Sequence, residues 1–407
     1  MNIFLIALLP ILVLSIQFQW DLRLHLDNVE YGRNFVSQYS LDGVAHFFWI
    51  ETNKGSLRLL YQALHPNKTL TERKTISTGT HLLKISPTVT AQVSNDGKHV
   101  LAAYTGYRVS PETSCDDNSR NSCFEIFFTE SINSGKDWDE PIRMNREDMN
   151  DVKHRSYPAM LLEKDTGRVY IGYNTYNNLT ISIREPGNKK FEMEYMLPNK
   201  TFAEGMALGY TIDKKNSIRY IHWFWTTLSY ETLYYKYSID NGKTWTNDMT
   251  LLQSVTIKKP PAIAINTEAL EGGIHIQYFQ KHDTIRQDVR MIWSKDHGKL
   301  WEGPQVLDET YYNANSINMC GNKEQAFIIS SNMETMVTPG YIRFVPIQGS
   351  NAYDIPYPFN QVDFATSGYS DISCVHIGNE KYLVTHMVLD NEAKSLYLAH
   401  GVFNHTS

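Results

Sequence analysis

The sequence predicts an all-β fold, a β-propeller of four-stranded blades. Three segments of the 407-residue chain share the pattern S-x-[DN]-x-G-x-x-W, and a run rich in aromatic and β-branched residues precedes each of them. Aromatic residues make up 12% of the chain, which also suits strands. The pattern residues are Ser131, Asn133, Gly135 and Trp138, then Ser238, Asp240, Gly242 and Trp245, and finally Ser294, Asp296, Gly298 and Trp301.

Each residue type that recurs in this pattern has a physical role in a turn. Asp or Asn bonds turn backbone groups, Gly supplies a positive φ, and Trp buries apolar area beside the hairpin. The pattern resembles the Asp box, or BNR repeat, of the sialidase-like β-propellers. That resemblance implies strand–turn–strand elements on the blade rim, so we expect a structural role for all three copies.

The spacing of the boxes indicates further blades. Ser131 and Ser238 are 107 residues apart, whereas Ser238 and Ser294 are 56 apart, so one blade without a good box lies between the first two. Its strands are expected near residues 157–162 and 168–173, with a degraded box between Ser182 and Phe191.

The whole chain divides into seven units, with expected starts near Arg33, Ile85, Tyr157, Met206, Pro261, Asn315 and Ser370. The last unit has only three convincing strands, so we expect Leu22–Leu26 to supply the fourth and close the ring. The prediction is therefore a single seven-bladed domain over residues 19–407. Six sialidase-type blades plus an accessory N-terminal blade form the alternative.

Composition limits the classes of function. A net charge of −6 gives no reason to expect binding to nucleic acid, and we find no phosphate loop or Cys/His metal cluster. We therefore predict no cofactor and no metal. The apolar run from Ile3 to Ile16 is too short for a membrane span and predicts a signal peptide over residues 1–18. A buried N-terminal strand is the alternative.

A signal peptide would place the protein outside the cell or in an endomembrane lumen. Four N-x-[ST] sequons agree with this, at Asn67, Asn178, Asn199 and Asn404. Four cysteines also fit an oxidising compartment. The candidate disulfides are a loop staple between Cys115 and Cys123 and a bridge between blades from Cys320 to Cys374, and buried free thiols are the alternative.

The resemblance to sialidases also implies a set of site residues. That family binds the carboxylate of sialic acid with three arginines and uses a Tyr nucleophile paired with a Glu. In the C-terminal part of this chain, the matching positions are Arg286 and Arg343 for the carboxylate, Tyr369 as nucleophile and Glu268 as its base.

The N-terminal part departs from the family pattern. Arg33 or Lys84 would stand for the first arginine, and a lysine cannot form the two parallel bonds of a guanidinium. Asp116 or Asp117 would be the acid on the loop. Each of these residues also has an ordinary explanation as a surface, ion-paired or packed side chain.

The incomplete set favours binding over catalysis. The first expectation is a secreted propeller that recognises glycans or other extracellular ligands through a partly retained central pocket for an anion or sugar. A retaining exo-α-sialidase is the second reading, and a protein-interaction scaffold is the third. The aromatic run from Ile221 to Trp225 is expected to be blade core.

Overall fold

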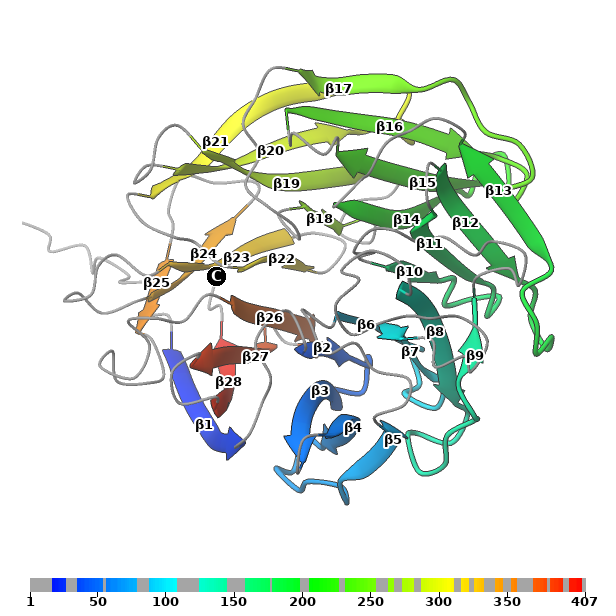
Figure 1. Ribbon diagram of the computed structural model, residues 1–407. Coiled ribbons are helices and arrows are strands. Elements are labelled where there is room, and N and C mark those ends of the chain that lie inside the picture. Colours follow the sequence, from blue (N-terminus) through cyan, green and yellow to red (C-terminus); the bar gives the residue numbers. More distant parts are fainter. Residues whose placement is uncertain are drawn as a thin grey trace, which may run out of the picture.

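The computed structural model describes most of the chain, with gaps between the strands. The described residues are 17–26, 35–53, 56–78, 88–107, 124–144, 158–175, 178–197, 205–226, 231–253, 263–266, 273–281, 287–310, 316–321, 326–332, 341–346, 353–356, 369–378, 381–390 and 395–404. Within these residues, the strands form seven four-stranded antiparallel sheets, which confirms an all-β propeller of four-stranded blades (Figure 1).

Six of the sheets are each made from four consecutive strands. They are β2–β5 (Phe35–Tyr39, Ala45–Asn53, Ser56–Leu64, Lys74–Thr78), β6–β9 (Val89–Val93, Val100–Tyr107, Phe124–Ser131, Ile142–Arg143), β10–β13 (Ala159–Leu162, Val169–Thr175, Asn178–Arg184, Met193–Leu197), β14–β17 (Met206–Asp213, Ile218–Thr226, Thr232–Ser238, Met249–Gln253), β18–β21 (Ile263–Asn266, Ile274–Lys281, Gln287–Ser294, Glu302–Thr310) and β22–β25 (Ser316–Gly321, Ala326–Asn332, Tyr341–Pro346, Tyr353–Pro356).

The remaining sheet joins the two ends of the chain. It contains β26 (Tyr369–His376), β27 (Lys381–Asp390), β28 (Ser395–Asn404) and, at its outer edge, β1 (Gln17–Leu26). The register of β1 against β28 runs from Gln17 opposite Asn404 to Leu26 opposite Leu396. The expected fourth strand at Leu22–Leu26 is therefore confirmed, and the strand is longer than expected. The strand begins at Gln17, so its first two residues fall within the segment 1–18 that was expected to be a signal peptide.

The first strands of successive sheets meet around the centre of the ring (Figure 1). β2 contacts β6, and the contacts continue through β10, β14, β18, β22 and β26 back to β2. The sheet β2–β5 therefore lies in the ring, between the β6 sheet and the sheet that joins the two chain ends. The fourth strands, such as β13 and β17, lie at the periphery (Figure 1).

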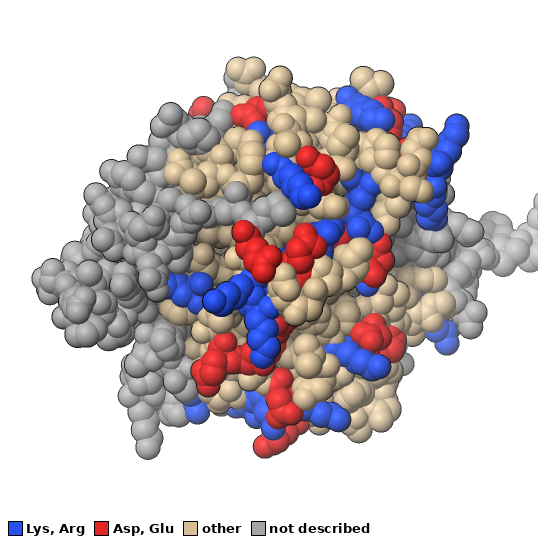
Figure 2. All heavy atoms as spheres, turned by 90° about the vertical axis from the view of Figure 1, so that its right-hand side faces the viewer, with Lys and Arg blue, Asp and Glu red and all other residues tan. Residues whose placement is uncertain are grey.

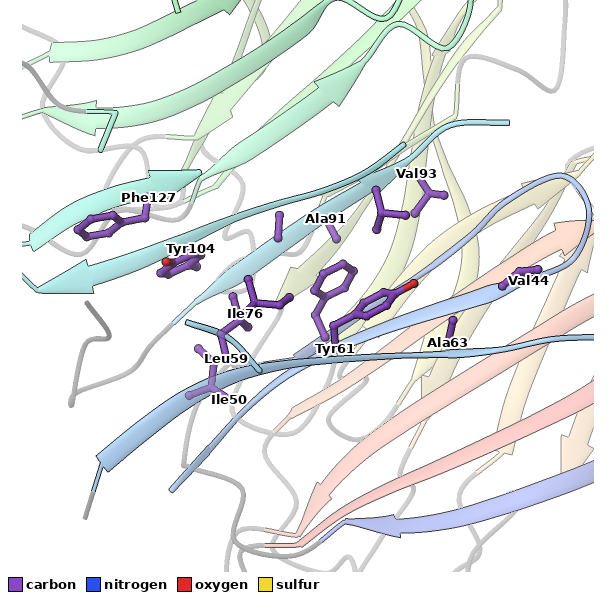
Figure 3. Packing of buried hydrophobic residues seen from close by; sticks show 13 residues of the cluster. Val44, Ile50, Leu59, Tyr61, Ala63, Ile76, Ala91, Val93, Tyr104 and Phe127 are labelled. Carbon is purple, nitrogen blue, oxygen red and sulfur yellow. The ribbon is translucent and has the colours of Figure 1, made fainter. Parts of the chain in front are cut away.

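The apolar core consists of clusters between neighbouring sheets. In one cluster, Phe48 and Tyr61 from the first sheet pack against Val93, Val100 and Tyr104 from the second. Tyr61, Val93 and Tyr104 are labelled in Figure 3. The predicted core run around His222 is confirmed: Trp223 and Phe224 are fully buried. Such inter-sheet packing fixes the angle between blades, because each interior is close-packed.

Antiparallel order gives each blade two distinct ends. The connections from first to second strand and from third to fourth strand lie at one end, and the Asp-box turns belong to it. We call this the box end. The connections from second to third strand, and from one blade to the next, lie at the opposite end, which we call the far end.

Candidate functional site

Two of the candidate ligand-binding residues lie on described strands. Arg343 is on β24, where its backbone pairs with Ser330 and Asp354. Tyr369 is the first residue of β26 and pairs with Leu389. Their side chains are outside the described part, as are the candidate residues Arg33, Lys84, Asp116, Asp117, Glu268 and Arg286.

Chain connectivity nevertheless relates most of these candidates to one end of the ring. Arg33 and Lys84 precede the first strands β2 and β6, and Arg286 directly precedes β20. Asp116 and Asp117 belong to the connection between β7 and β8. All the strand ends that flank these five residues lie at the far end, as do the start of β26 and the first half of β24.

Glu268 differs from the others in its neighbours. It belongs to the connection between β18 and β19, and the flanking residues Asn266 and Ile274 are at the box end. The strand β18 lies between this end and the far end; it is four residues long and spans roughly 13 Å. Glu268 itself lies outside the described residues, so its pairing with Tyr369 stays a prediction.

Sequence reasoning missed a carboxylate on the innermost strand β26. Asp371 follows Tyr369 by two residues, so the two positions share one face of the strand. Ser37 on β2 donates to its Oδ2 twice, from the hydroxyl at 2.6 Å and from the backbone N–H at 2.9 Å. The detectable signal was an acidic residue inside a strand that has no other acidic residue.

Burial dominates the electrostatics of this carboxyl. It raises the pKa of Asp371 to about 6, although the two hydrogen bonds from Ser37 act in the opposite direction. Next to it, the Ser37 and Ser373 hydroxyls lie 2.7 Å apart. The junction of the first and last blades therefore contains a carboxyl whose pKa is raised to about 6.

A second polar contact joins the same two blades. The Tyr39 hydroxyl lies 2.5 Å from Thr385 Oγ1 and 3.0 Å from His400 Nδ1. Burial raises the pKa of Tyr39 well above its ordinary value, so the phenol stays protonated. The Tyr39 hydroxyl therefore forms hydrogen bonds with buried polar groups, and a phenol with a raised pKa is a poor nucleophile.

The three Asp boxes have the same hydrogen bonds. In the second box, Gly242 N–H donates to Ser238 Oγ at 2.8 Å, and Thr244 N–H donates to Asp240 Oδ1 at 2.8 Å. Trp245 Nε1–H then donates to Gly242 O at 3.0 Å. The first and third boxes repeat this pattern with Ser131, Asn133, Gly135 and Trp138 and with Ser294, Asp296, Gly298 and Trp301.

Each box also packs against the preceding blade. A Cβ on Gly135 would lie 2.1 Å from Tyr61, one on Gly242 would lie 2.5 Å from Ile183, and one on Gly298 would lie 1.8 Å from Tyr235. The box glycines therefore permit close contact between blades in addition to their positive φ. This geometry gives the boxes a structural role at the junctions between blades.

The degraded box uses a different aromatic residue. In the turn after β12, Phe191 packs edge-on against Phe128 of the preceding blade at 5.2 Å between ring centroids. Arg184, which is buried, lies over both rings and pairs with Glu130 across the same junction. Here an aromatic cluster and an ion pair replace the tryptophan of the box.

The cysteines and sequons are described only in part. Cys374 on β26 takes part in a disulfide bond, and Cys320 belongs to the neighbouring strand β22. The pairing of these two cysteines stays a prediction, and Cys115 and Cys123 lie outside the described residues, as does Asn199. Asn404 is the last residue of β28, and its side chain is not described.

Charged groups on the described surface are of both signs. On the side of the ring shown in Figure 2, basic and acidic side chains are interspersed. Arg168 pairs with Glu185, and Arg219 pairs with Asp165. Among the described residues, no group of His, Cys, Asp and Glu is arranged to hold a metal ion, and no helix is long and apolar enough to cross a membrane.

Comparisons place the chain by its fold. No protein-family model and no curated protein sequence matches it. Among solved structures, it is similar to a protein of unknown function from Dyadobacter fermentans (12% identity, TM-score 0.54, 96% of this chain and 99% of that chain covered). It is also similar to the polysaccharide lyase Uly1 (12% identity, TM-score 0.52, 92% of this chain and 90% of that chain covered). A third similar structure is that of a NanB sialidase from Streptococcus pneumoniae (12% identity, TM-score 0.45, 93% of this chain and 68% of that chain covered). The described part of the chain has a β-propeller fold of four-stranded blades, and its three Asp-box turns resemble those of the sialidase-like propellers.

Proposed function

We propose that the protein is a secreted glycan-binding propeller that holds an acidic sugar, of the sialic acid type, at the far end of the ring. The observation that carries this proposal is the connectivity of the candidate residues. Arg286, Arg343 and Tyr369 come from three consecutive blades, and the described strand ends next to them all lie at the far end. Arg33 and Lys84 precede the next two blades around the ring.

The chemistry of these residue types supports an anionic ligand. A guanidinium donates two parallel hydrogen bonds to a carboxylate, and charge-assisted bonds of this kind are stronger than neutral ones. A tyrosine next to such arginines would offer an aromatic face and a hydroxyl to a sugar ring. The box end, by contrast, is occupied by turns whose polar groups bond one another.

Catalysis as an exo-α-sialidase is the second candidate function. It needs a base for the Tyr369 phenol, because an unassisted phenol with an ordinary pKa is a poor nucleophile near neutral pH. The strand ends beside Glu268 are at the box end, which favours binding over this reaction. Asp371 is a carboxyl on the same strand face as Tyr369, and its raised pKa suits a proton acceptor.

Direct binding to sialyllactose, measured by calorimetry with lactose as the uncharged control, tests the proposal. Removing a guanidinium with Arg343→Ala or Arg286→Ala should weaken binding by about tenfold to a hundredfold, the effect of a lost charged hydrogen bond. Arg343→Lys should retain only part of the affinity that Arg343→Ala loses. Lys243→Ala removes an exposed charge at the box end and should leave affinity unchanged.

The outcomes separate the candidate functions. Equal affinity for lactose and sialyllactose, or arginine variants that bind like the wild type, would refute the acidic-sugar site. Release of a fluorogenic aryl group from its α-sialoside, abolished by Tyr369→Phe, would instead establish the sialidase. A folded protein with neither activity would favour the scaffold reading.

A further inference from the structure

The turn between β4 and β5 occupies the place of an Asp box in the first blade. It connects the third and fourth strands at the box end but lacks the box sequence. The turn is well bonded: His65 N–H donates to Thr69 O at 2.9 Å, and Lys68 N–H donates to His65 O at 2.8 Å. Lys68 has a φ of 68°, which tightens the turn.

This turn presents the first of the four sequons, Asn67-Lys68-Thr69. All six residues from His65 to Leu70 are exposed. Asn67 Oδ1 accepts two hydrogen bonds from Thr69, from the hydroxyl at 2.6 Å and from the backbone N–H at 3.1 Å. Both bonds use the carbonyl oxygen of the amide, and neither uses Nδ2, the atom that would carry a sugar.

Asn178 has the same type of sequence in a different environment. It is the first residue of β12, half-buried, and its backbone pairs with Thr175 on β11. Thr180, the third residue of this sequon, is fully buried, with Tyr173 and Met196 opposite it on the two neighbouring strands. A large polar glycan at Asn178 would conflict with the packing of this blade.

We infer that Asn67 is an N-glycan attachment site of the folded protein and that Asn178 is not. The donor is a lipid-linked oligosaccharide pyrophosphate in the secretory pathway. Asn67 Nδ2 loses a proton and forms a bond to the anomeric carbon, whose bond to the pyrophosphate oxygen breaks, so that the lipid pyrophosphate leaves. The fold accommodates the attached glycan because every residue of the turn from His65 to Leu70 is exposed.

The position of the turn predicts what this glycan does not do. Asn67 is at the box end, and the strand ends beside Arg286, Arg343 and Tyr369 are at the far end. A glycan on Asn67 therefore leaves the proposed ligand site uncovered. It instead covers part of the rim of the first blade, beside the exposed turn residues.

The test is site-by-site glycan mapping of the full chain secreted from mammalian cells. A second form, with residues 1–16 replaced by a proven secretory leader, places the chain in the same compartment independently of its own N-terminus. The protein is treated with N-glycosidase in heavy-oxygen water, so that each Asn that carried a glycan becomes an Asp labelled with heavy oxygen. It is then digested, and the labelled peptides are identified by mass. Variants Asn67→Gln and Thr69→Ala each remove the sequon, Thr69→Ser keeps it, and Asn178→Gln is the matched control.

The expected result is label at Asn67 and none at Asn178. One glycan should disappear from Asn67→Gln and Thr69→Ala and remain in Thr69→Ser and Asn178→Gln. Secreted, folded protein without label at Asn67 would overturn the inference, and so would label at Asn178 in protein that is folded by circular dichroism. Because the readout is mass, it does not depend on ligand binding or turnover.

Discussion

Ser37 on β2 donates two hydrogen bonds to Asp371 on β26, residues 334 positions apart in the chain. The contact joins the innermost strands of the first and last blades, and the closure that β1 makes on β28 lies at the opposite edge of the last blade. The ring is therefore closed at its periphery by a backbone ladder and at its centre by a carboxylate that accepts hydrogen bonds.

Removing the Ser37 hydroxyl should weaken this inner closure. Ser37→Ala leaves a buried carboxylate with one hydrogen bond fewer, so the free energy of unfolding should fall by about 1–3 kcal/mol at pH 7.5. The loss should be smaller at pH 5, because burial raises the pKa of Asp371 to about 6 and the carboxyl is then neutral. Urea unfolding at the two pH values measures both quantities.

Asp371→Asn tests the sign of the pH effect. A carboxyl whose pKa is higher in the folded than in the unfolded state costs stability as pH rises through about 6. The asparagine variant lacks this cost, so its stability relative to the wild type should increase between pH 5 and pH 7.5. A difference that stays constant over this range would show that Asp371 is not a titrating group of the ring.

Buried histidines should have the opposite effect to Asp371, because they make the folded protein less stable as pH falls. Burial lowers the pKa of His222 and His386 to about 3 and that of His46 and His275 to about 4. Below pH 6.5 the unfolded chain binds protons that the folded chain does not, so stability falls as pH falls. Each histidine adds to this loss only between pH 6.5 and its own lowered pKa in the folded protein.

His222→Gln isolates one of these contributions. The variant should be less stable at pH 7.5, because His222 bonds Thr211 and Tyr235, but its stability should fall less steeply toward pH 5. Tyr235→Phe is the matched control, since it removes the bond to His222 Nδ1 and keeps the histidine. If both variants show the wild-type slope, His222 does not stay neutral in the folded protein.

The box glycines allow backbone strain to be separated from steric conflict. Gly298 and Gly187 have nearly the same φ, 82° and 80°, but a Cβ meets Tyr235 at 1.8 Å in the first case and nothing within 4 Å in the second. Gly187→Ala should cost about 1 kcal/mol for the left-handed backbone. Gly298→Ala should cost about 1–3 kcal/mol more, because the blade junction must shift. Thermal unfolding measures both, and equal losses would refute the role of close approach.

Local patterns in the sequence predicted the blades well. The start expected at Met206 coincides with β14, and that expected at Asn315 precedes β22 by one residue. The fourth strand of the last blade was predicted at Leu22–Leu26 because three strands leave an open edge. These features repeat along the chain or follow from the need to pair every strand, so a single sequence reveals them.

Contacts between distant segments were harder to predict. The bonds from Ser37 to Asp371 depend on closing the ring, and nothing local to Ser-Asp-Ile-Ser indicates the partner. The contact of each box glycine with the preceding blade was missed for the same reason. Glu268 was grouped with Tyr369 by order along the chain, and this pairing stays a prediction because Glu268 lies outside the described residues. Spacing along the chain does not tell which end of a blade a residue occupies.

The ion pair between Glu130 and Arg184 is the clearest charged link between blades. Arg184 is 4% exposed and its Nη2 donates to Glu130 Oε2 at 2.6 Å. Burial would raise the pKa of Glu130, but hydrogen bonds from His99 and Arg184 outweigh burial and lower it to about 2. Arg184→Met alone leaves a partly buried carboxylate without its main partner and should cost about 3–5 kcal/mol.

The double variant Glu130→Gln with Arg184→Met should recover much of that loss. It removes the unpaired charge and keeps apolar contact with Phe128 and Phe191, over which the guanidinium lies. Because Glu130 has a lowered pKa, the wild type should lose the contribution of the pair as pH falls from 4.5 toward about 2, whereas the double variant should not. A full double-mutant cycle in urea gives the coupling energy, and a value near zero would mean that packing of the aromatic pair alone holds this junction.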